Sequence, residues 1–249
     1  MLDIGPAAST GDAERPASAP SHNLVLRILS AAVLAPLALL VAWLGGWPFA
    51  LFWGLAAVAV LWEWTTLVMG AHYRLMLACG WTSAGIGYAG CMLLAPLLLR
   101  ADRAYGFSAM ALLFAIVWST DIFAYFAGRA IGGPKLAPAV SPNKTWAGAV
   151  AGTLGAVIAA VVVAGFIGTL DKGTIAVVAL LLSVATQLGD LLESWIKRQF
   201  GAKDASHLIP GHGGVMDRLD GFWAAALAGC LVGLLRGGFD NAARGLLVW

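Results

Sequence analysis

Residues 147–170 read AGAVAGTLGAVIAAVVVAGFIGTL, a run of 24 residues without a single charged side chain. A helix of about 20 apolar residues spans the hydrocarbon core of a bilayer, so this run predicts a membrane-spanning helix. Comparable apolar runs occupy residues 24–44, 48–69, 75–99, 105–126 and 174–196, and another begins at Gly221. The sequence therefore predicts an all-α, polytopic transmembrane helical bundle of about seven spans, within a range of about six to nine.

The composition also indicates a membrane protein. Of the 249 residues, 60% are apolar and 11% are charged, whereas a soluble domain carries about 25% charged residues. So few charges cannot cover a water-soluble surface, which excludes a soluble globular enzyme. The formal net charge of +2 excludes nucleic acid as a partner bound through bulk positive charge. Cys79, Cys91 and Cys230 lie in apolar runs without metal-ligand spacing and are expected to be packing residues.

Residues 1–22 differ from the rest of the chain, since they combine proline, alanine and serine with three acidic residues. They predict a disordered tail, and no signal peptide, because the apolar run that follows is too long. Residues 23–249 are expected to form a single transmembrane catalytic domain with two long loops, 127–146 and 197–220. The last span is interrupted at Arg236-Gly-Gly and could resume to Trp249.

The distribution of lysine and arginine predicts the orientation. With seven spans, the tail, loop 70–74 and both long loops lie on one side and carry ten of the 15 basic residues. The side with more lysine and arginine is normally cytoplasmic. We therefore expect a cytoplasmic N-terminus, with both long loops facing the cytosol.

Four acidic residues fall inside the predicted spans, namely Glu63, Asp121, Asp190 and Glu193. Charged groups in the membrane are costly and mark functional sites. Each lies near the cytoplasmic end of its span, whereas a transporter would be expected to carry charges near the midplane. Structural alternatives stay open: Asp121 and Glu193 could make helix–helix hydrogen bonds, and Glu63 could snorkel to the interface.

The second long loop and the helix before it concentrate charged groups. Helical spacing places Asp190, Glu193, Ser194 and Lys197 on one face. The segment 189–221 contains the cations Lys197, Arg198, Lys203 and Arg218, the carboxylates Asp190, Glu193, Asp204, Asp217 and Asp220, and also His207 and His212. Lysine and arginine bind phosphate oxygens, and carboxylates bind magnesium together with phosphate. The segment predicts a site for a metal-bound polyphosphate, the alternative being a solvated loop that only sets topology.

The first long loop ends with Ser141, Asn143, Lys144 and Thr145, directly before the predicted span 147–170. Their hydroxyl, amide and ammonium groups can donate to an anion, and a helix N-terminus favours negative charge. The pattern is no Walker A loop. For Thr145, an ordinary helix cap is the alternative interpretation.

The segment from Ser194 to Asp220 reads S-x-I-K-R-x4-K-D-x-S-x2-I-P-x-H-G-G-V-x-D-R-L-D. It resembles the motif of the phosphatidate cytidylyltransferase family, also called CDP-diacylglycerol synthases. Two upstream patterns are similar to the family as well, Asp121-x3-Tyr125-x2-Gly128-Arg129 and Ser141-Pro142-x-Lys144-Thr145-x2-Gly148. One departure is Ala147, where many members carry Glu or Gln.

The resemblance implies an enzyme that converts CTP and phosphatidate to CDP-diacylglycerol and pyrophosphate. It also implies Mg²⁺ as cofactor, with a second cation left open, and a homodimer among the lipids of a bacterial inner membrane, with the active site facing the cytoplasm. In the family, the aspartate of Gly-Asp and the first aspartate of Asp-Arg-x-Asp are associated with metal. These correspond to Asp190 and Asp217 here, and Asp220 is a weaker candidate ligand.

The expected roles follow from the charges of the substrates. Phosphatidate is mostly dianionic at neutral pH and needs no general base, so His212 is expected to serve a structural hydrogen bond or substrate binding rather than proton transfer. The expected catalytic residues are Asp190, Lys197, Arg198, Lys203, Asp217 and Arg218, and the expected metal ligands are Asp190, Asp217 and Asp220. The expected substrate-binding residues are Ser141, Asn143, Lys144, Thr145, Ser194, His212, Gly213, Gly214 and Asp121.

Rival functions share part of this chemistry. A CTP-dependent lipid kinase, or a CDP-lipid synthase for another lipid phosphate, would also use CTP, metal and membrane, and only the products separate them. A transporter is less favoured because no internal repeat is visible. A non-catalytic scaffold offers no reason for the charged loop.

Overall fold

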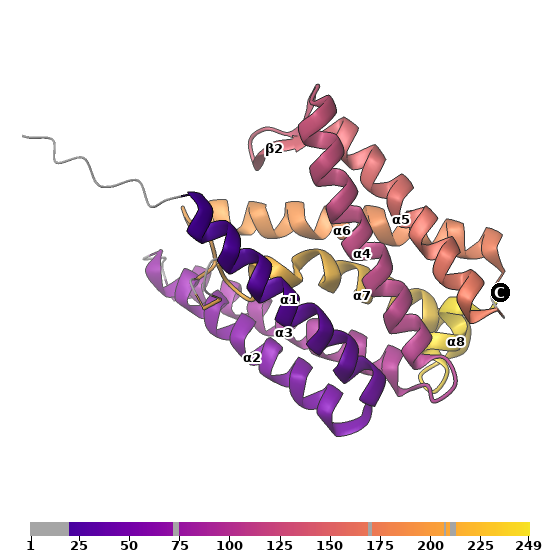
Figure 1. The fold of residues 1–249 in the computed structure, drawn as a ribbon. Helices are drawn as coiled ribbons and strands as arrows, with labels where there is room; N and C mark the ends of the chain where they lie inside the picture. The colour runs from indigo at the N-terminus through magenta and orange to yellow at the C-terminus, as the bar shows by residue number, and fades with distance from the viewer. Residues whose placement is uncertain (1–19, 72–74, 169–170, 207, 210–212) are drawn as a thin grey trace, which may run out of the picture.

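The computed structural model describes residues 20–71, 75–168, 171–206, 208–209 and 213–249, with the backbone alone for residues 20–31 and 75. Within these ranges the chain forms eight helices and one two-stranded hairpin (Figure 1). The helices are α1 Pro20–Leu44, α2 Gly46–Gly70, α3 Leu75–Ala101, α4 Gly106–Ile131, α5 Trp146–Ile167, α6 Lys172–Gln199, α7 Met216–Gly237 and α8 Ala242–Leu247. The strands are β1 Lys135–Ala137 and β2 Ser141–Thr145.

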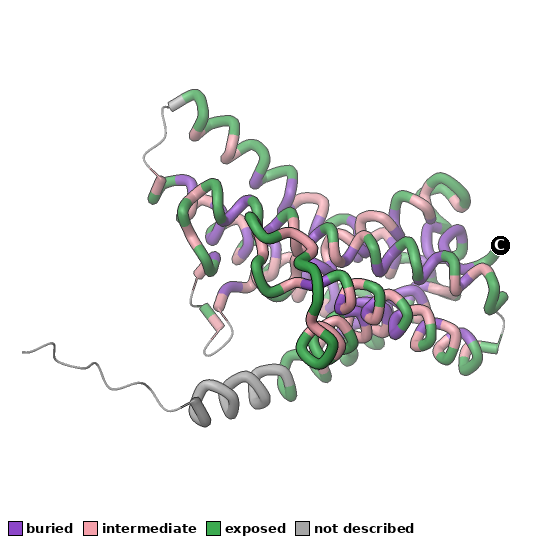
Figure 2. Tube along the Cα trace, turned by 90° about the horizontal axis from the view of Figure 1, so that it is seen from above, coloured by how far each residue is buried: buried purple, intermediate pink, exposed green. Residues whose placement is uncertain are grey.

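Six of the described helices, α2 to α7, are long and apolar enough to cross a membrane. The expected class, a helical membrane bundle, is confirmed. The predicted tail 1–22 lies outside the described residues as far as residue 19, and α1 begins at Pro20. Figure 2 shows buried residues along the middle of the bundle and exposed ones on its outer faces. Large apolar side chains such as Leu55 and Val58 are exposed there, as expected of a surface that faces lipid.

The C-terminal region departs from a straight final span. α7 begins at Met216, earlier than the predicted Gly221, and ends at Gly237. The following residue, Gly238, has a φ of 69°, which only glycine adopts readily. α8 then folds back onto α7, where a Cβ at Gly233 would lie 2.1 Å from the carbonyl oxygen of Ala242. The apolar run therefore does not resume as a continuation of the span.

The first long loop is shorter and more ordered than predicted. α4 continues to Ile131, and the antiparallel hairpin β1–β2 follows, pairing Lys135 with Thr145 and Ala137 with Ser141. Proline is depleted in β-strands, and this segment contains Pro138 and Pro142. The sequence therefore did not predict the hairpin. The hairpin ends directly at α5, so β2 is held against the start of that helix (Figure 1).

Glycines allow α4 and α5 to pack closely along their length. A Cβ at Gly152 would lie 2.7 Å from the carbonyl oxygen of Thr120, and one at Gly155 would lie 2.3 Å from the Phe123 side chain. Small residues let transmembrane helices approach to backbone distance. Figure 1 shows the two helices side by side, with β2 at one end of the pair.

A buried polar cluster joins α4 and α5 to α6. The hydroxyls of Thr120 and Ser183 are 2.8 Å apart, Ser183 lies 3.3 Å from Thr153 Oγ1, and Gln187 Nε2 donates to Thr153 Oγ1 at 3.0 Å. Satisfied hydroxyl and amide groups inside an apolar bundle specify one arrangement of the helices.

The N-terminus of α6 is capped by Asp171, which accepts a hydrogen bond from the Thr174 amide at 2.7 Å. Hydrogen bonds from the Thr174 side chain and amide lower the pKa of Asp171.

Candidate active site

A cavity of about 910 Å³ lies between α4, α5, α6, the first turn of α7 and the β1–β2 hairpin. Its charged lining residues are Asp121, Arg129, Lys135, Lys144, Asp190, Glu193, Lys197, Asp204, Asp217, Arg218 and Asp220. Three of the four acids that the sequence places inside spans are among them, and so are residues of both long loops. The bundle thus brings the two charged segments of the chain into one chamber.

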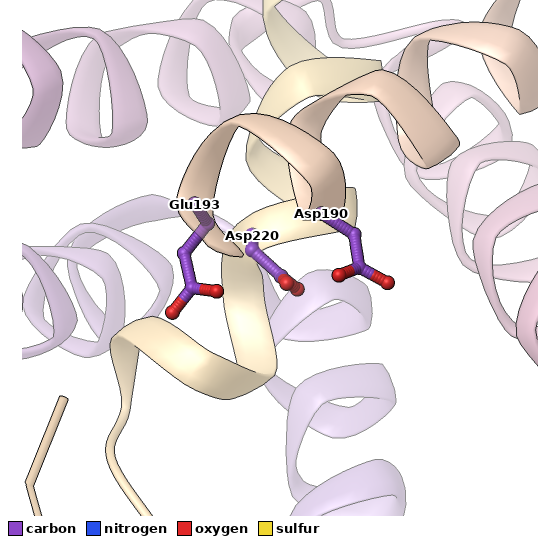
Figure 3. Close-up of side chains that lie close together, drawn as sticks. All are labelled: Asp190, Glu193 and Asp220. Carbon is purple, nitrogen blue, oxygen red and sulfur yellow. The ribbon is translucent and has the colours of Figure 1, made fainter. Parts of the chain in front are cut away.

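Three carboxylates meet in this chamber. One oxygen from each of Asp190, Glu193 and Asp220 lies within 4.8 Å of the others, and their side chains point into the same space (Figure 3). Gly189 makes the meeting possible, because a Cβ there would lie 2.4 Å from the Ala224 Cβ and 2.6 Å from the Asp220 carbonyl oxygen. The absence of a side chain at position 189 lets α6 and α7 approach until their acids converge.

Glu193 shows that the cluster fits a cation. Its side chain is only 1% exposed, its Oε2 lies 2.8 Å from Lys197 Nζ, and its buried Oε1 has no hydrogen-bond partner among the described residues. A buried carboxylate oxygen without a partner is costly. Several carboxylate oxygens around one space are the donor set that Mg²⁺ and Ca²⁺ prefer. The residues present therefore fit a divalent metal, and Glu193 joins Asp190 and Asp220 as a candidate ligand.

Asp217 lies beside this cluster, but its oxygens are occupied. Oδ1 accepts from Lys197 Nζ at 2.5 Å, and Oδ2 accepts from the amides of Ala205 and Gly214 at 3.0 and 2.9 Å. Lys197 thus bridges Glu193 and Asp217. In this arrangement Glu193 takes the third place in the cluster, where the sequence pattern led us to expect Asp217.

The hairpin supplies a cation to the same chamber. Lys144 on β2 forms an ion pair with Asp190 on α6, and Ser194 donates to Asp190 Oδ1 at 3.5 Å. Thr145 follows Lys144, is buried, and accepts a hydrogen bond from the Gly148 amide at 3.1 Å. Thr145 is therefore the cap of α5, as its alternative interpretation held, and its side chain also lines the cavity.

The structure separates the expected site residues into two groups. Those that line the cavity are Asp121, Asn143, Lys144, Thr145, Asp190, Ser194, Lys197, Asp217, Arg218 and Asp220. Those described but outside its lining are Ser141, Arg198, Lys203, Gly213 and Gly214. Arg198 donates to the carbonyl oxygen of Ala202 at 3.1 Å, within its own loop. His207 and His212 lie outside the described residues.

Other lining residues were not expected as site residues. Arg129 donates to the Tyr125 hydroxyl at 3.3 Å, and Lys135 stands on β1 opposite Thr145. Asp121, Tyr125 and Arg129 follow one another at intervals of four residues, which places them on one face of a helix. This spacing could have identified Tyr125 and Arg129 as site residues. Lys135 could not be identified in this way, because only the hairpin turns its strand toward the chamber.

The alternative interpretation of Glu63, that its side chain snorkels to the membrane interface, is wrong. Its side chain is fully buried and accepts hydrogen bonds from Ser206 Oγ at 2.5 Å, from the Val215 amide at 2.8 Å and from the Met216 amide at 2.7 Å. Nothing near Glu63 in the sequence indicates these partners, which lie more than 140 residues away.

Comparison with known proteins agrees with the motif. The sequence profile of the Cytidylyltransferase family matches residues 76–234. A Brucella abortus protein named phosphatidate cytidylyltransferase is 43% identical, over 82% of this chain and 91% of the relative. Proteins of the same name from Rickettsia bellii (35%; 80% and 85% covered) and Haemophilus influenzae (45%; 50% and 45% covered) also match. The resemblance carried by the motif is thereby confirmed, and this chain belongs to the cytidylyltransferase family.

Proposed function

We propose that this chain is an integral-membrane nucleotidyltransferase that converts CTP and phosphatidate to CDP-diacylglycerol and pyrophosphate in phospholipid biosynthesis. The observation that carries the proposal is a single chamber in which an acidic cluster with an unpartnered buried oxygen faces Lys144, Lys197 and Arg218. The names of the relatives, matched over about four-fifths of the chain, supply the substrates.

The reaction needs charge control more than proton transfer. The phosphate of phosphatidate is already mostly dianionic at neutral pH. One of its oxygens attacks the α-phosphorus of CTP, and a new P–O bond forms. The bond from the α-phosphorus to the oxygen that bridges to the β-phosphate breaks, and its electron pair leaves with pyrophosphate. Two polyanions must meet, so positioning and electrostatic stabilisation supply most of the rate.

We assign metal binding to Asp190, Glu193 and Asp220, and the metal that suits a nucleoside triphosphate is Mg²⁺. When bound, it would neutralise triphosphate charge and the charge that develops on the leaving pyrophosphate. Asp217 would join this set only after Lys197 releases its Oδ1. The proposed role of Lys197 and Arg218 is to hold phosphate oxygens.

Lys144 has a double role in the proposal. Its ammonium group forms an ion pair with Asp190 and neutralises that carboxylate. If Asp190 held a divalent cation, Lys144 would instead bind a substrate phosphate from the hairpin side. Arg129 and Lys135 stand on the same side of the cavity and can add to this phosphate binding.

We further propose that α1 is a seventh span, that the N-terminus and the cavity lie on the cytoplasmic side of a bacterial inner membrane, and that the enzyme is a homodimer. The basic residues of the sequence support the orientation, since a chain of seven spans is expected to carry ten of its 15 lysines and arginines on the side of the two long loops. The 25-residue length of α1 supports the seventh span.

The decisive experiment supplies purified protein with CTP labelled in the cytidine ring, phosphatidate in mixed micelles, and Mg²⁺, and identifies the products. We expect the label in a lipid-soluble CDP-diacylglycerol, with equimolar pyrophosphate. Free labelled CDP with a newly phosphorylated lipid would indicate a kinase. No label in lipid with phosphatidate, but labelled lipid in a parallel reaction with another lipid phosphate, would indicate a different CDP-lipid synthase. Either result would overturn the proposed reaction.

A further inference from the structure

Glu63 is a buried carboxylate outside the cavity that the proposed mechanism does not use. It sits on α2, whereas all three of its hydrogen-bond donors belong to the loop before α7 and to the first turn of α7. Two of these donors are backbone amides, those of Val215 and Met216. Glu63 therefore holds the beginning of α7 from a different helix.

The beginning of α7 lacks a cap from its own residues. Val215 is its N-cap position and makes no side-chain cap hydrogen bond. The first amides of a helix have no partner within the helix and carry partial positive charge, so a carboxylate placed there is stabilising. Glu63 fills this role from another helix, α2. Asp217 Oδ2 accepts a hydrogen bond from the preceding amide, that of Gly214.

The glycine at 214 is explained by the same contact. Gly214 is buried, and a Cβ there would lie 2.8 Å from Glu63 Oε1. Any side chain at 214 would push the carboxylate away from the amides of Val215 and Met216. Gly214, which the motif led us to expect at the substrate, thus makes room for Glu63.

The first five residues of α7 include Asp217, Arg218 and Asp220, all of which line the cavity, whereas Glu63 does not. We propose that Glu63 is a positioning residue that fixes the start of α7 and so aims Asp220 at Asp190 and Glu193. The proposal rests on the proposed function only in taking this cluster as a cation site. Groups behind the ligands set metal affinity because they fix the ligands' orientation.

The structure offers a matched control at the other end of the bundle. Asp102 is 7% exposed and also accepts three hydrogen bonds, from the amides of Ala104, Tyr105 and Arg244 at 2.9, 3.0 and 3.1 Å. It holds the starts of α4 and α8, away from the cavity lining. Loss of either carboxylate should lower the stability of the bundle, but only Glu63 should affect the cation site.

The test measures Mn²⁺ binding to the purified full chain by electron paramagnetic resonance, without substrate, with melting temperatures recorded in EDTA. We expect Glu63→Gln to weaken Mn²⁺ binding about tenfold or more, and Asp102→Asn to change it by less than about twofold. Ser206→Ala removes one of the three donors to Glu63 and should weaken binding about twofold to fivefold. This milder variant keeps the test valid if Glu63→Gln does not fold.

Equal Mn²⁺ affinity in wild type and the Glu63 or Ser206 variants would overturn the proposal, and so would equal losses in Glu63→Gln and Asp102→Asn. If the wild type bound Mn²⁺ and only the positioning effect were missing, the metal assignment would survive. If the wild type bound no Mn²⁺, the positioning proposal and the metal assignment would both fall, while product analysis with CTP would still decide the reaction.

Discussion

At the scale of single residues, the sequence and the structure favour different residues as the third metal ligand beside Asp190 and Asp220. The sequence motif favours Asp217 as a metal ligand, whereas the geometry favours Glu193, whose Oε1 is buried without a partner among the described residues. Asp217 is held by Lys197 and by two amides. These assignments differ in how metal should change the stability of each variant.

We predict that Glu193→Gln abolishes stabilisation by Mg²⁺ without lowering the melting temperature in EDTA. The substitution removes the energetic cost of a buried charged oxygen that has no partner among the described residues. Lys197 keeps its ion pair with Asp217. The wild type should gain thermal stability as Mg²⁺ is added, because a ligand that binds only the folded state stabilises it. Thermal unfolding with and without Mg²⁺ checks this.

Asp171→Asn is the control for that variant, since Asp171 caps the other end of the same helix. It should leave the gain from Mg²⁺ unchanged. A lower melting temperature of Glu193→Gln in EDTA, with an intact response to Mg²⁺, would show that Glu193 serves helix packing instead. Loss of the response in Asp217→Asn alone would restore Asp217 as the principal ligand.

The pattern of residue types predicted much of the site, but not the residues that hold its helices in place. Asp190, Lys197, Asp217 and Asp220 were found because charged groups in an apolar chain stand out and share helical faces. The role of Glu63 was missed because its partners come from a loop more than 140 residues later, and local spacing carries no information on such contacts.

At the scale of elements, the α4–α5 pair positions Asp121 and the hairpin relative to α6. We predict that Gly152→Ala destabilises the protein by about 1–3 kcal/mol, because the new methyl group would meet the Thr120 carbonyl oxygen, which is backbone and cannot move aside cheaply. Denaturant-induced unfolding of the detergent-solubilised chain, followed by tryptophan fluorescence, measures the loss.

Gly54→Ala makes the same substitution inside α2, where nothing lies within 4 Å of the added Cβ. It should leave stability unchanged or raise it by up to about 1 kcal/mol through the better helix propensity of alanine. If both variants behaved alike, close α4–α5 packing would not limit the fold.

The elements themselves were predictable to different degrees. Long apolar runs predicted the six described helices that are long enough to cross a membrane, because the bilayer demands apolar length. The ends were less predictable: α4 extends to Ile131 and α7 starts at Met216, beyond and before the predicted limits of 126 and 221. The added turn of α7, residues 216–220, carries three charged residues, and that of α4, residues 127–131, carries one charged residue and a glycine, so hydropathy alone did not extend the predicted spans over them.

At the scale of the whole molecule, α7 is a 22-residue helix, about 33 Å long. Its beginning lines the same cavity as the hairpin, and its end turns into α8. In a background with Cys79, Cys91 and Cys230 replaced by alanine, we predict that Ala139→Cys reacts with an impermeant maleimide only from the cytoplasmic face. Asn241→Cys should react only from the opposite face. Both positions are exposed.

Labelling of intact spheroplasts and of inverted vesicles, compared by gel shift, provides the measurement. Reaction of both cysteines from one face would contradict the membrane-spanning arrangement of α7. Reaction of Ala139→Cys only from outside would invert the proposed orientation and move the cavity away from cytosolic CTP.

The contact at Gly189 has a use in surveys of genomes. A count of acidic residues in apolar helices does not tell whether those acids meet in the folded chain. A methyl group at 189 would already collide with Ala224 and with the backbone of Asp220. A bulky residue there would keep the acids in the sequence yet part the two helices that carry them, so position 189 has to be read together with the acids.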